Sequence, residues 1–245
     1  MCSDPDSRWY DIGKISNSVL CLIEFTIRRK LKTIGFFIMK KYIQYGCGLD
    51  NPDGWGNYDA SPTLRIQKLP VVGAFAKKRA GFPGDVKYGD IVKGLPLGND
   101  SVDVVYCSHV LEHLSLSAFE DALKNTYKIL KPGGVFRLVL PDFRVLVDEY
   151  INNESELAAV SFMCNTGMAS ETRNRGFKGF LVEWLGNSRH LWLWDYPSLR
   201  KYLKDTGFTE IRRAYFGDSS DSIFNSVENH ERWTNALGIE CVKPQ

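Results

Sequence analysis

Short apolar runs alternate with segments of helical periodicity along the chain from Lys41 onward. Three runs near the start are bounded by glycines and have the length and composition of strands. They are residues 41–45, 55–59 and 85–91. The run at 101–110 is rich in valine, which is typical of a strand buried on both faces of a sheet.

A helix is predicted after this buried run, because apolar residues recur at helical spacing. They are Phe119, Leu123, Tyr127 and Leu130. Ser117 is the expected N-cap, and the prolyl-glycyl sequence at 132–134 is the expected stop. Residues 135–142 then predict a further strand. A helix at 198–208, ending at Gly207, precedes two last strands at 210–216 and 238–243.

Strands and helices in this order predict an α/β fold with an open, mostly parallel sheet flanked by helices. In such folds ligands bind outside the carboxyl ends of the strands. One departure follows from spacing: too few residues separate Gly48 from Asp59 for a full helix and a return strand. The first helix is therefore expected to be shortened to a turn.

Residues 1–38 are expected to form an N-terminal helical extension of a domain at 39–245. Apolar clusters there flank a basic patch at 28–32, whose charges rule out a continuous transmembrane span. The segment could pack against the sheet, which is the favoured interpretation, or make peripheral contact with a membrane surface. If it covers a sheet face, its deletion should abolish folding.

The composition argues against some classes of function but does not indicate a particular one. The net charge is +2 without long basic runs, so nucleic acid is not an expected partner. Six cysteines are scattered singly, which fits a reducing cytoplasm and no structural zinc site or disulfide scaffold. The first ten residues are polar and acidic, unlike a secretory signal.

The turn after the first strand carries Gly46 and Gly48 but lacks the third glycine of a dinucleotide site. Asp50 would place a carboxylate beside phosphates, and Asp59 comes well before the spacing of about 20 residues found in dinucleotide folds. An adenosine with a cationic sulfonium and no phosphate fits this acidic lining. For such a ligand, Asp59 could accept hydrogen bonds from the ribose hydroxyls, and Asp90 could accept one from the adenine amino group.

The ordered set "YGCG", "GNYDAS", "GDIVKGLPLGNDSVDVVYCSHVLEHL" and "YKILKPGGVFRLVLPDF" resembles class I methyltransferases, particularly a bacterial group associated with cell-surface polysaccharide synthesis. The resemblance covers residues 41–150. It implies a Rossmann-like sheet with a final antiparallel strand and S-adenosylmethionine as methyl donor. The cofactor-binding residues that it implies are Tyr45, Gly46, Cys47, Gly48, Asp59, Ala60, Asp90, Ile91 and Ser108.

The sequence "HVLEH" at 109–113 would place His109 and His113 on one face of a helix and matches a zinc-peptidase pattern. A peptidase is not expected, because the pattern lies within the methyltransferase series. A divalent metal held by His109, Glu112 and His113, as in some methyltransferases that the chain resembles, is an alternative that we do not favour. Glu112 and His113 could instead only brace the following helix.

Methyl transfer to a hydroxyl requires placement of the acceptor and removal of its proton. His109 follows the buried strand and is expected to face the acceptor as the base. His190 is a second candidate. Asp142 could orient the base or act as one, or could equally be the N-cap of the helix that follows.

Residues 151–196 lose the regular alternation and are expected to form an acceptor-binding insertion. Its aromatic residues, which could stack on sugars or form core, are Trp184, Trp192, Trp194 and Tyr196. Its basic residues, which could bind an anionic acceptor or lie on a solvated face, are Arg173, Arg175, Arg189 and His190. The expected function is O-methylation of a sugar, nucleotide-sugar or glycan intermediate. Another small-molecule acceptor and a non-catalytic cofactor-binding protein remain alternatives.

Overall fold

The computed structural model describes residues 40–67, 81–170 and 189–245 of the chain. The expected extension at 1–38 lies outside the described residues, as does part of the expected insertion. Among the described residues, none of the helices combines the length and apolar character needed to cross a bilayer.

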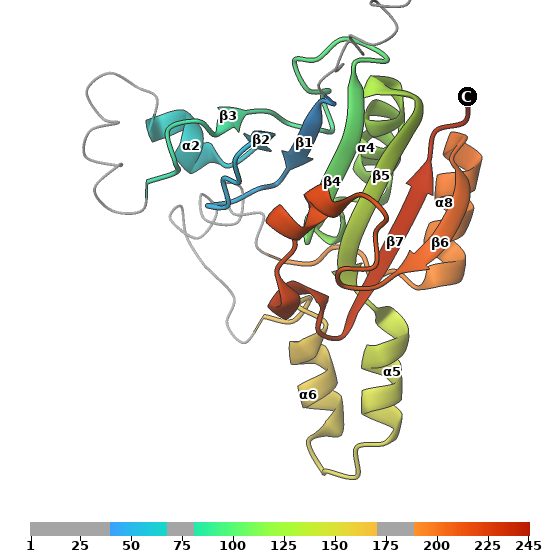
Figure 1. Cartoon of the computed structure of the whole chain (residues 1–245). Coiled ribbons are helices and arrows are strands. Elements are labelled where there is room, and N and C mark those ends of the chain that lie inside the picture. The colour runs from blue at the N-terminus through green and yellow to red at the C-terminus, as the bar shows by residue number, and fades with distance from the viewer. Residues whose placement is uncertain (1–39, 68–80, 171–188) are drawn as a thin grey trace, which may run out of the picture. The chain divides into compact units, whose positions relative to one another are not determined.

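Seven strands of the described residues form one sheet in the order β3-β2-β1-β4-β5-β7-β6 (Figure 1). The strands are β1 Tyr42–Tyr45, β2 Trp55–Asp59, β3 Lys87–Tyr88, β4 Val102–Ser108, β5 Leu130–Pro141, β6 Thr209–Ala214 and β7 Ala236–Val242. Strands β1 to β5 pair in parallel, whereas β7 runs antiparallel to both β5 and β6. The predicted α/β class, the Rossmann-like sheet and the final antiparallel strand are confirmed.

The helices lie on the faces and at one end of this sheet. The α-helices are α2 Pro62–Gln67, α4 Leu116–Ile129, α5 Phe143–Ile151, α6 Ala158–Asn165 and α8 Tyr196–Thr206. The 3-10 helices are η1 Leu111–His113, η2 Ser222–Ser226 and η3 His230–Trp233. Helices α5 and α6 run side by side beyond the lower end of the sheet in Figure 1.

Local capping explains where the helices begin and end. Helix α8 starts with a capping box between Asp195 and Ser198 and ends at Gly207, whose φ of 112° is left-handed, as predicted. Helix α4 starts earlier than predicted: the N-cap is Ser115, whose side chain accepts a hydrogen bond from the Ala118 amide, and not Ser117. It also ends earlier, since Leu130 already belongs to β5.

The chain between β1 and β2 contains turns and no helix, which confirms the shortened first helix. The third strand is shorter than predicted, because only Lys87 and Tyr88 pair with β2.

The core lies on both faces of the central strand β4, as the valine-rich run predicts. Val105 and Cys107 pack with α4 and α8, while Val104 and Tyr106 point to the opposite face and pack with Trp55 and Phe224. Successive side chains of a strand alternate between faces, so a strand buried on both sides is apolar at most of its positions, as β4 is. The strand ends are therefore held in fixed positions.

Candidate functional site

The glycine turn after β1 is fastened to the end of β2. Gly46 and Gly48 have φ values of 66° and 57°, a backbone conformation that residues other than glycine rarely adopt. A Cβ atom at Gly46 would also collide with the Val110 side chain. The Asp59 carboxylate accepts hydrogen bonds from the amides of Gly48, at 2.9 Å, and Ser61, at 2.7 Å. Asp59 thus shapes the turn, and its oxygens keep lone pairs for further donors.

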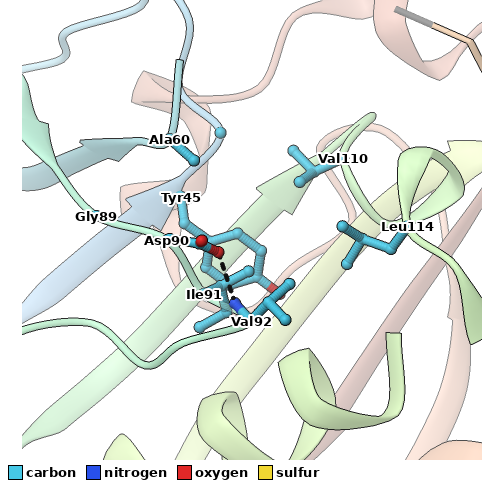
Figure 2. A pocket seen from close by; sticks show the side chains of 9 residues that line it. Tyr45, Ala60, Gly89, Asp90, Ile91, Val92, Val110 and Leu114 are labelled. Atoms are coloured by element: carbon cyan, nitrogen blue, oxygen red, sulfur yellow. Dashed lines mark hydrogen bonds between the residues drawn. The ribbon is translucent and has the colours of Figure 1, made fainter. Parts of the chain in front are cut away.

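A cavity of about 270 Å³ opens where β1, β2 and β4 end and the chain leaves β3. Its lining consists of Tyr45, Gly46, Ala60, Gly89, Asp90, Ile91, Val92, Val110 and Leu114 (Figure 2). Figure 2 shows Val110 and Leu114 on one side of the cavity and Ala60 and Asp90 on the other. The cavity therefore lies at the edge of the sheet where the sequence predicts a ligand.

The charge in this lining comes from Asp90. Its carboxylate accepts a hydrogen bond from the Val92 amide at 3.0 Å, and the Lys93 ammonium lies 3.3 Å away. These contacts fix the orientation of the carboxylate while leaving acceptor capacity on both oxygens. A ligand amino or hydroxyl group entering the cavity would find a preoriented acceptor there.

Five of the nine residues predicted to bind the cofactor line the cavity: Tyr45, Gly46, Ala60, Asp90 and Ile91. Cys47, Gly48, Asp59 and Ser108 do not. Cys47 and Ser108 are buried, at 3% and 7% exposure.

Sequence reasoning did not single out four lining residues: Gly89, Val92, Val110 and Leu114. The apolar spacing of Val110 and Leu114 around "LEH" was the signal that could have identified the last two.

His109 lies where the sequence predicts, directly after β4, but it is not on a helix. Its φ of 53° turns the chain, and only the following 3-10 turn η1 is helical. Its Nε2 lies 2.8 Å from the Arg232 carbonyl and its Nδ1 lies 3.2 Å from Glu112 Oε1. Burial lowers the pKa of His109, but its hydrogen bonds to Glu112 and the Arg232 carbonyl outweigh this and raise the pKa above its usual 6.5. With both nitrogens engaged, His109 has no free lone pair for an acceptor.

Two further histidines, His113 and His190, lie near Glu112, whose side chain is fully buried. His113 Nε2 and His190 Nε2 each lie 3.9 Å from Glu112 Oε1. The Leu191 and Trp192 amides donate to the Glu112 carbonyl at 2.8 and 3.1 Å, which fastens the segment carrying His190 to η1. The structure therefore brings together His109 and His190, two of the three predicted catalytic residues, and adds Glu112 between them.

Asp142, the third predicted catalytic residue, is the N-cap of α5. Its side chain accepts a hydrogen bond from the Arg144 amide at 2.9 Å, and Arg213 lies 3.3 Å away. The capping alternative is confirmed by this geometry, and the carboxylate is only 3% exposed.

The described part of the insertion separates core from surface. Trp194 is 1% exposed and stacks on Phe119 with 4.1 Å between ring centroids, so of its two predicted alternatives the core position is confirmed. Tyr196 is the first residue of α8, and its hydroxyl donates a hydrogen bond to the Ile211 carbonyl. Trp192 is 41% exposed. Arg189 donates to the Ser170 hydroxyl. Arg173, Arg175 and Trp184 lie outside the described residues.

The sheet order, the antiparallel β7 and the cavity above β1 define a class I methyltransferase fold. Residues 58–138 match the family model described as "Methyltransferase domain". The chain carries a class I S-adenosylmethionine-dependent methyltransferase domain, and S-adenosylmethionine is the methyl donor of this family.

Two curated relatives match parts of the chain. A probable S-adenosylmethionine-dependent methyltransferase of Mycolicibacterium smegmatis is 34% identical over 103 residues, which cover 41% of this chain and 37% of the relative. An uncharacterized protein of Saccharomyces cerevisiae, YBR225W, is 24% identical over 124 residues, covering 49% of this chain and 13% of the relative. The matches thus span less than two thirds of either relative.

Among solved structures, a complex of the Haloferax volcanii Trm112 methyltransferase activator with a putative methyltransferase gives a TM-score of 0.44. The sequence identity is 17%, and the alignment covers 94% of this chain and 95% of the other.

Proposed function

We propose that this chain transfers a methyl group from S-adenosylmethionine to a hydroxyl of a sugar, nucleotide-sugar or glycan acceptor. The observation that carries the proposal is the cavity at the strand ends, where Asp90 faces apolar walls beside a left-handed glycine at Gly46. An adenine ring needs apolar walls and one oriented acceptor, and the glycine lets the ligand approach the backbone closely.

The position of the histidine cluster supports a hydroxyl acceptor. Val110 and Leu114 line the cavity, and His109, Glu112 and His113 belong to the same short stretch of chain. An acceptor placed against the donor methyl therefore comes close to the polar groups around Glu112. Positioning the acceptor in line supplies much of the rate, since the sulfonium is already activated.

Proton removal is the step that the cluster would assist. His109 could act as the base only after releasing Arg232 or Glu112, because both of its nitrogens are engaged. In His190 only Nδ1 is engaged, by the Thr166 carbonyl. Its Nε2 points toward Glu112 without a hydrogen bond to it. Proton removal thus falls to His190 when its Nε2 holds no ligand, and otherwise to a group that the cluster binds.

The glycan acceptor rests on the resemblance to methyltransferases of surface polysaccharide synthesis and on the half-exposed Trp192, an aromatic surface of the kind that stacks on sugars.

The direct test is release of demethylated cofactor when the chain is incubated with S-adenosylmethionine and a panel of nucleotide-sugars and oligosaccharides. We expect release with at least one sugar acceptor, accompanied by the mass of one added methyl group on that acceptor. Asp90→Ala should lower turnover at low cofactor concentration by about 10- to 100-fold. Asp85→Ala, which removes an exposed carboxylate in the same segment, should leave it unchanged.

Cofactor binding without release from any acceptor would favour the non-catalytic alternative. Release with amines or thiols but never with sugars would contradict the proposed acceptor class.

A further inference from the structure

We propose that Glu112, His113 and His190 form a binding site for one divalent transition-metal ion of the Zn²⁺ type. Each residue offers one ligand atom, and these three atoms lie within 4.8 Å of one another. The His113 and His190 Nε2 atoms are both 3.9 Å from Glu112 Oε1, too far for hydrogen bonds but close enough to converge on one ion. The site comes from two segments far apart in the sequence.

The outer nitrogens of both histidines are held by backbone carbonyls. His113 Nδ1 lies 3.0 Å from the Arg189 carbonyl, and His190 Nδ1 lies 2.7 Å from the Thr166 carbonyl. A carbonyl only accepts, so the proton of each neutral ring resides on Nδ1 and the lone pair on Nε2 faces Glu112. Metal-binding histidines are oriented by the same kind of second hydrogen bond.

The buried carboxylate supplies a second, independent reason for a cation. The Glu112 side chain is 0% exposed, and among the described residues neither Oε1 nor Oε2 has a partner that meets hydrogen-bond geometry. The closest polar contact of its Oε1 is His109 Nδ1, at 3.2 Å. A buried carboxylate is costly unless positive charge or several donors compensate it.

His109 can place positive charge beside Oε1 alone, and a protonated His113–His190 pair is a poorer source of further charge than a metal ion. The His113 and His190 rings have centroids 4.9 Å apart, so two imidazolium ions there would repel each other. One metal ion shared by both Nε2 atoms and the carboxylate avoids this repulsion and satisfies all three groups.

The ligand set determines the kind of metal and leaves room for substrate. Two imidazoles and a carboxylate suit Zn²⁺ and its neighbours better than Mg²⁺ or Ca²⁺, and three protein ligands leave a coordination position open. Each histidine side chain is 19% exposed, so an ion can reach the site. His109, which touches Glu112 Oε1 rather than the ion, acts as a positioning residue for the carboxylate.

A consequence that rests on the proposed function concerns the acceptor. The site adjoins the cavity through Val110 and Leu114, so an acceptor hydroxyl bound at the open position would lie toward the donor methyl. Coordination by a divalent cation would lower the pKa of a bound hydroxyl and so promote transfer of its proton to a solvent water molecule, since His109 cannot accept the proton while both its nitrogens are engaged.

The test is titration of the chelator-treated full chain with ZnCl₂ by calorimetry, with CoCl₂ absorption spectra as a second readout. We expect one Zn²⁺ per chain and visible Co²⁺ bands typical of nitrogen and oxygen ligands. Glu112→Gln and His190→Ala should weaken Zn²⁺ binding by about 100-fold or more, and His109→Ala by about 10- to 100-fold.

Two further variants separate ligation from folding. His230→Ala removes an exposed histidine outside the cluster and should bind Zn²⁺ like the unaltered chain. His190→Cys replaces one zinc ligand by another and should restore binding that His190→Ala loses. Absence of Zn²⁺ binding by the unaltered chain would overturn the site, as would equal Zn²⁺ affinity in His190→Ala, Glu112→Gln and His230→Ala.

The Zn²⁺ titration contains no methyl acceptor, so its result does not depend on methyl transfer. Zn²⁺ binding in a chain that releases no demethylated cofactor would leave the metal site standing and contradict only the proposed function. Methyl transfer that is unaffected by chelation, in a chain that binds no Zn²⁺, would give the opposite result.

Discussion

At the scale of single residues, the glycine turn depends on Gly46 for two separate reasons. Its φ of 66° disfavours any side chain, and Val110 occupies the space that a Cβ would need. Gly54 has a φ of 80° and no atom within 4 Å of a Cβ, so it shares only the first constraint.

Gly46→Ala should therefore destabilise the protein by about 3 kcal/mol or more, through left-handed strain plus overpacking. Gly54→Ala should cost only about 1–2 kcal/mol from strain. Urea denaturation of the two variants measures the difference, and equal losses would show that Val110 can move aside.

Cys47, in the same turn, should be chemically inert in the folded protein. Burial, with the nearby Asp59 carboxylate, raises the pKa of its thiol to about 12. Because only the thiolate reacts with iodoacetamide, Cys47 at pH 8 should be alkylated at least about 100-fold more slowly than the exposed Cys164. Peptide mass spectrometry of timed samples measures both rates. Comparable labelling of the two cysteines would mean that the turn opens readily.

Residue identities could be predicted from the sequence where a backbone constraint or a strand end demanded them, as at Gly46 and Asp90. They could not be predicted where distant segments meet. His190 joins Glu112 only because the Leu191 and Trp192 amides bind the Glu112 carbonyl, a contact between residues almost eighty positions apart. Trp194 is equally ambiguous in sequence, since an aromatic residue suits a sugar site as well as a core.

At the scale of elements, Asp142 connects the end of β5 to the start of α5. Capping needs only a side-chain oxygen, which asparagine also has, whereas base catalysis needs a carboxylate. Asp142→Asn should thus keep stability and methyl transfer near those of the unaltered chain, and Asp142→Ala should lose about 1 kcal/mol of stability. Thermal denaturation and demethylated-cofactor release together test this. A loss of turnover in a stable Asp142→Asn would restore the catalytic assignment.

The type of each element was predictable, because the hydrophobic period distinguishes a strand from a helix. The residues at which elements begin and end were harder to predict. The sequence "HVLEH" has the spacing of a helical face, yet His109 has a φ of 53° and only a 3-10 turn follows. Contacts of His109 with Arg232 and Glu112 determine that backbone, and neither contact is visible in the local pattern. Ser115 and Ser117 are both good N-caps, and the packing of Leu116 against the core favours the first.

At the scale of the whole molecule, a buried ion cluster fastens the C-terminal region to the sheet. Arg137, in the middle of β5, is 0% exposed and contacts Glu228 at 2.6 Å, Glu240 at 2.9 Å and Asp218 at 3.0 Å. Its guanidinium also lies 4.8 Å from the centre of the Trp233 ring. The "VFRLVL" pattern predicted this strand correctly, but not that its arginine would be buried.

Arg137→Leu should destabilise the fold by about 3–5 kcal/mol, because it leaves the buried Glu228 carboxylate without its cation. Arg212→Leu is the matched control: its side chain, 41% exposed, pairs with the same Glu240 and Asp218, and its loss should cost no more than about 1 kcal/mol. Guanidinium denaturation resolves the two values. Similar losses would mean that the cluster gains little from burial.

Binding of S-adenosylmethionine in the cavity over the first strands can be measured by calorimetric titration of the full chain with this cofactor. We predict one binding site, an affinity about 10- to 100-fold weaker in Asp90→Ala, and an unchanged affinity in Asp85→Ala. Absence of binding to the unaltered chain, or equal affinity in Asp90→Ala, would mean that this cavity is not the cofactor site.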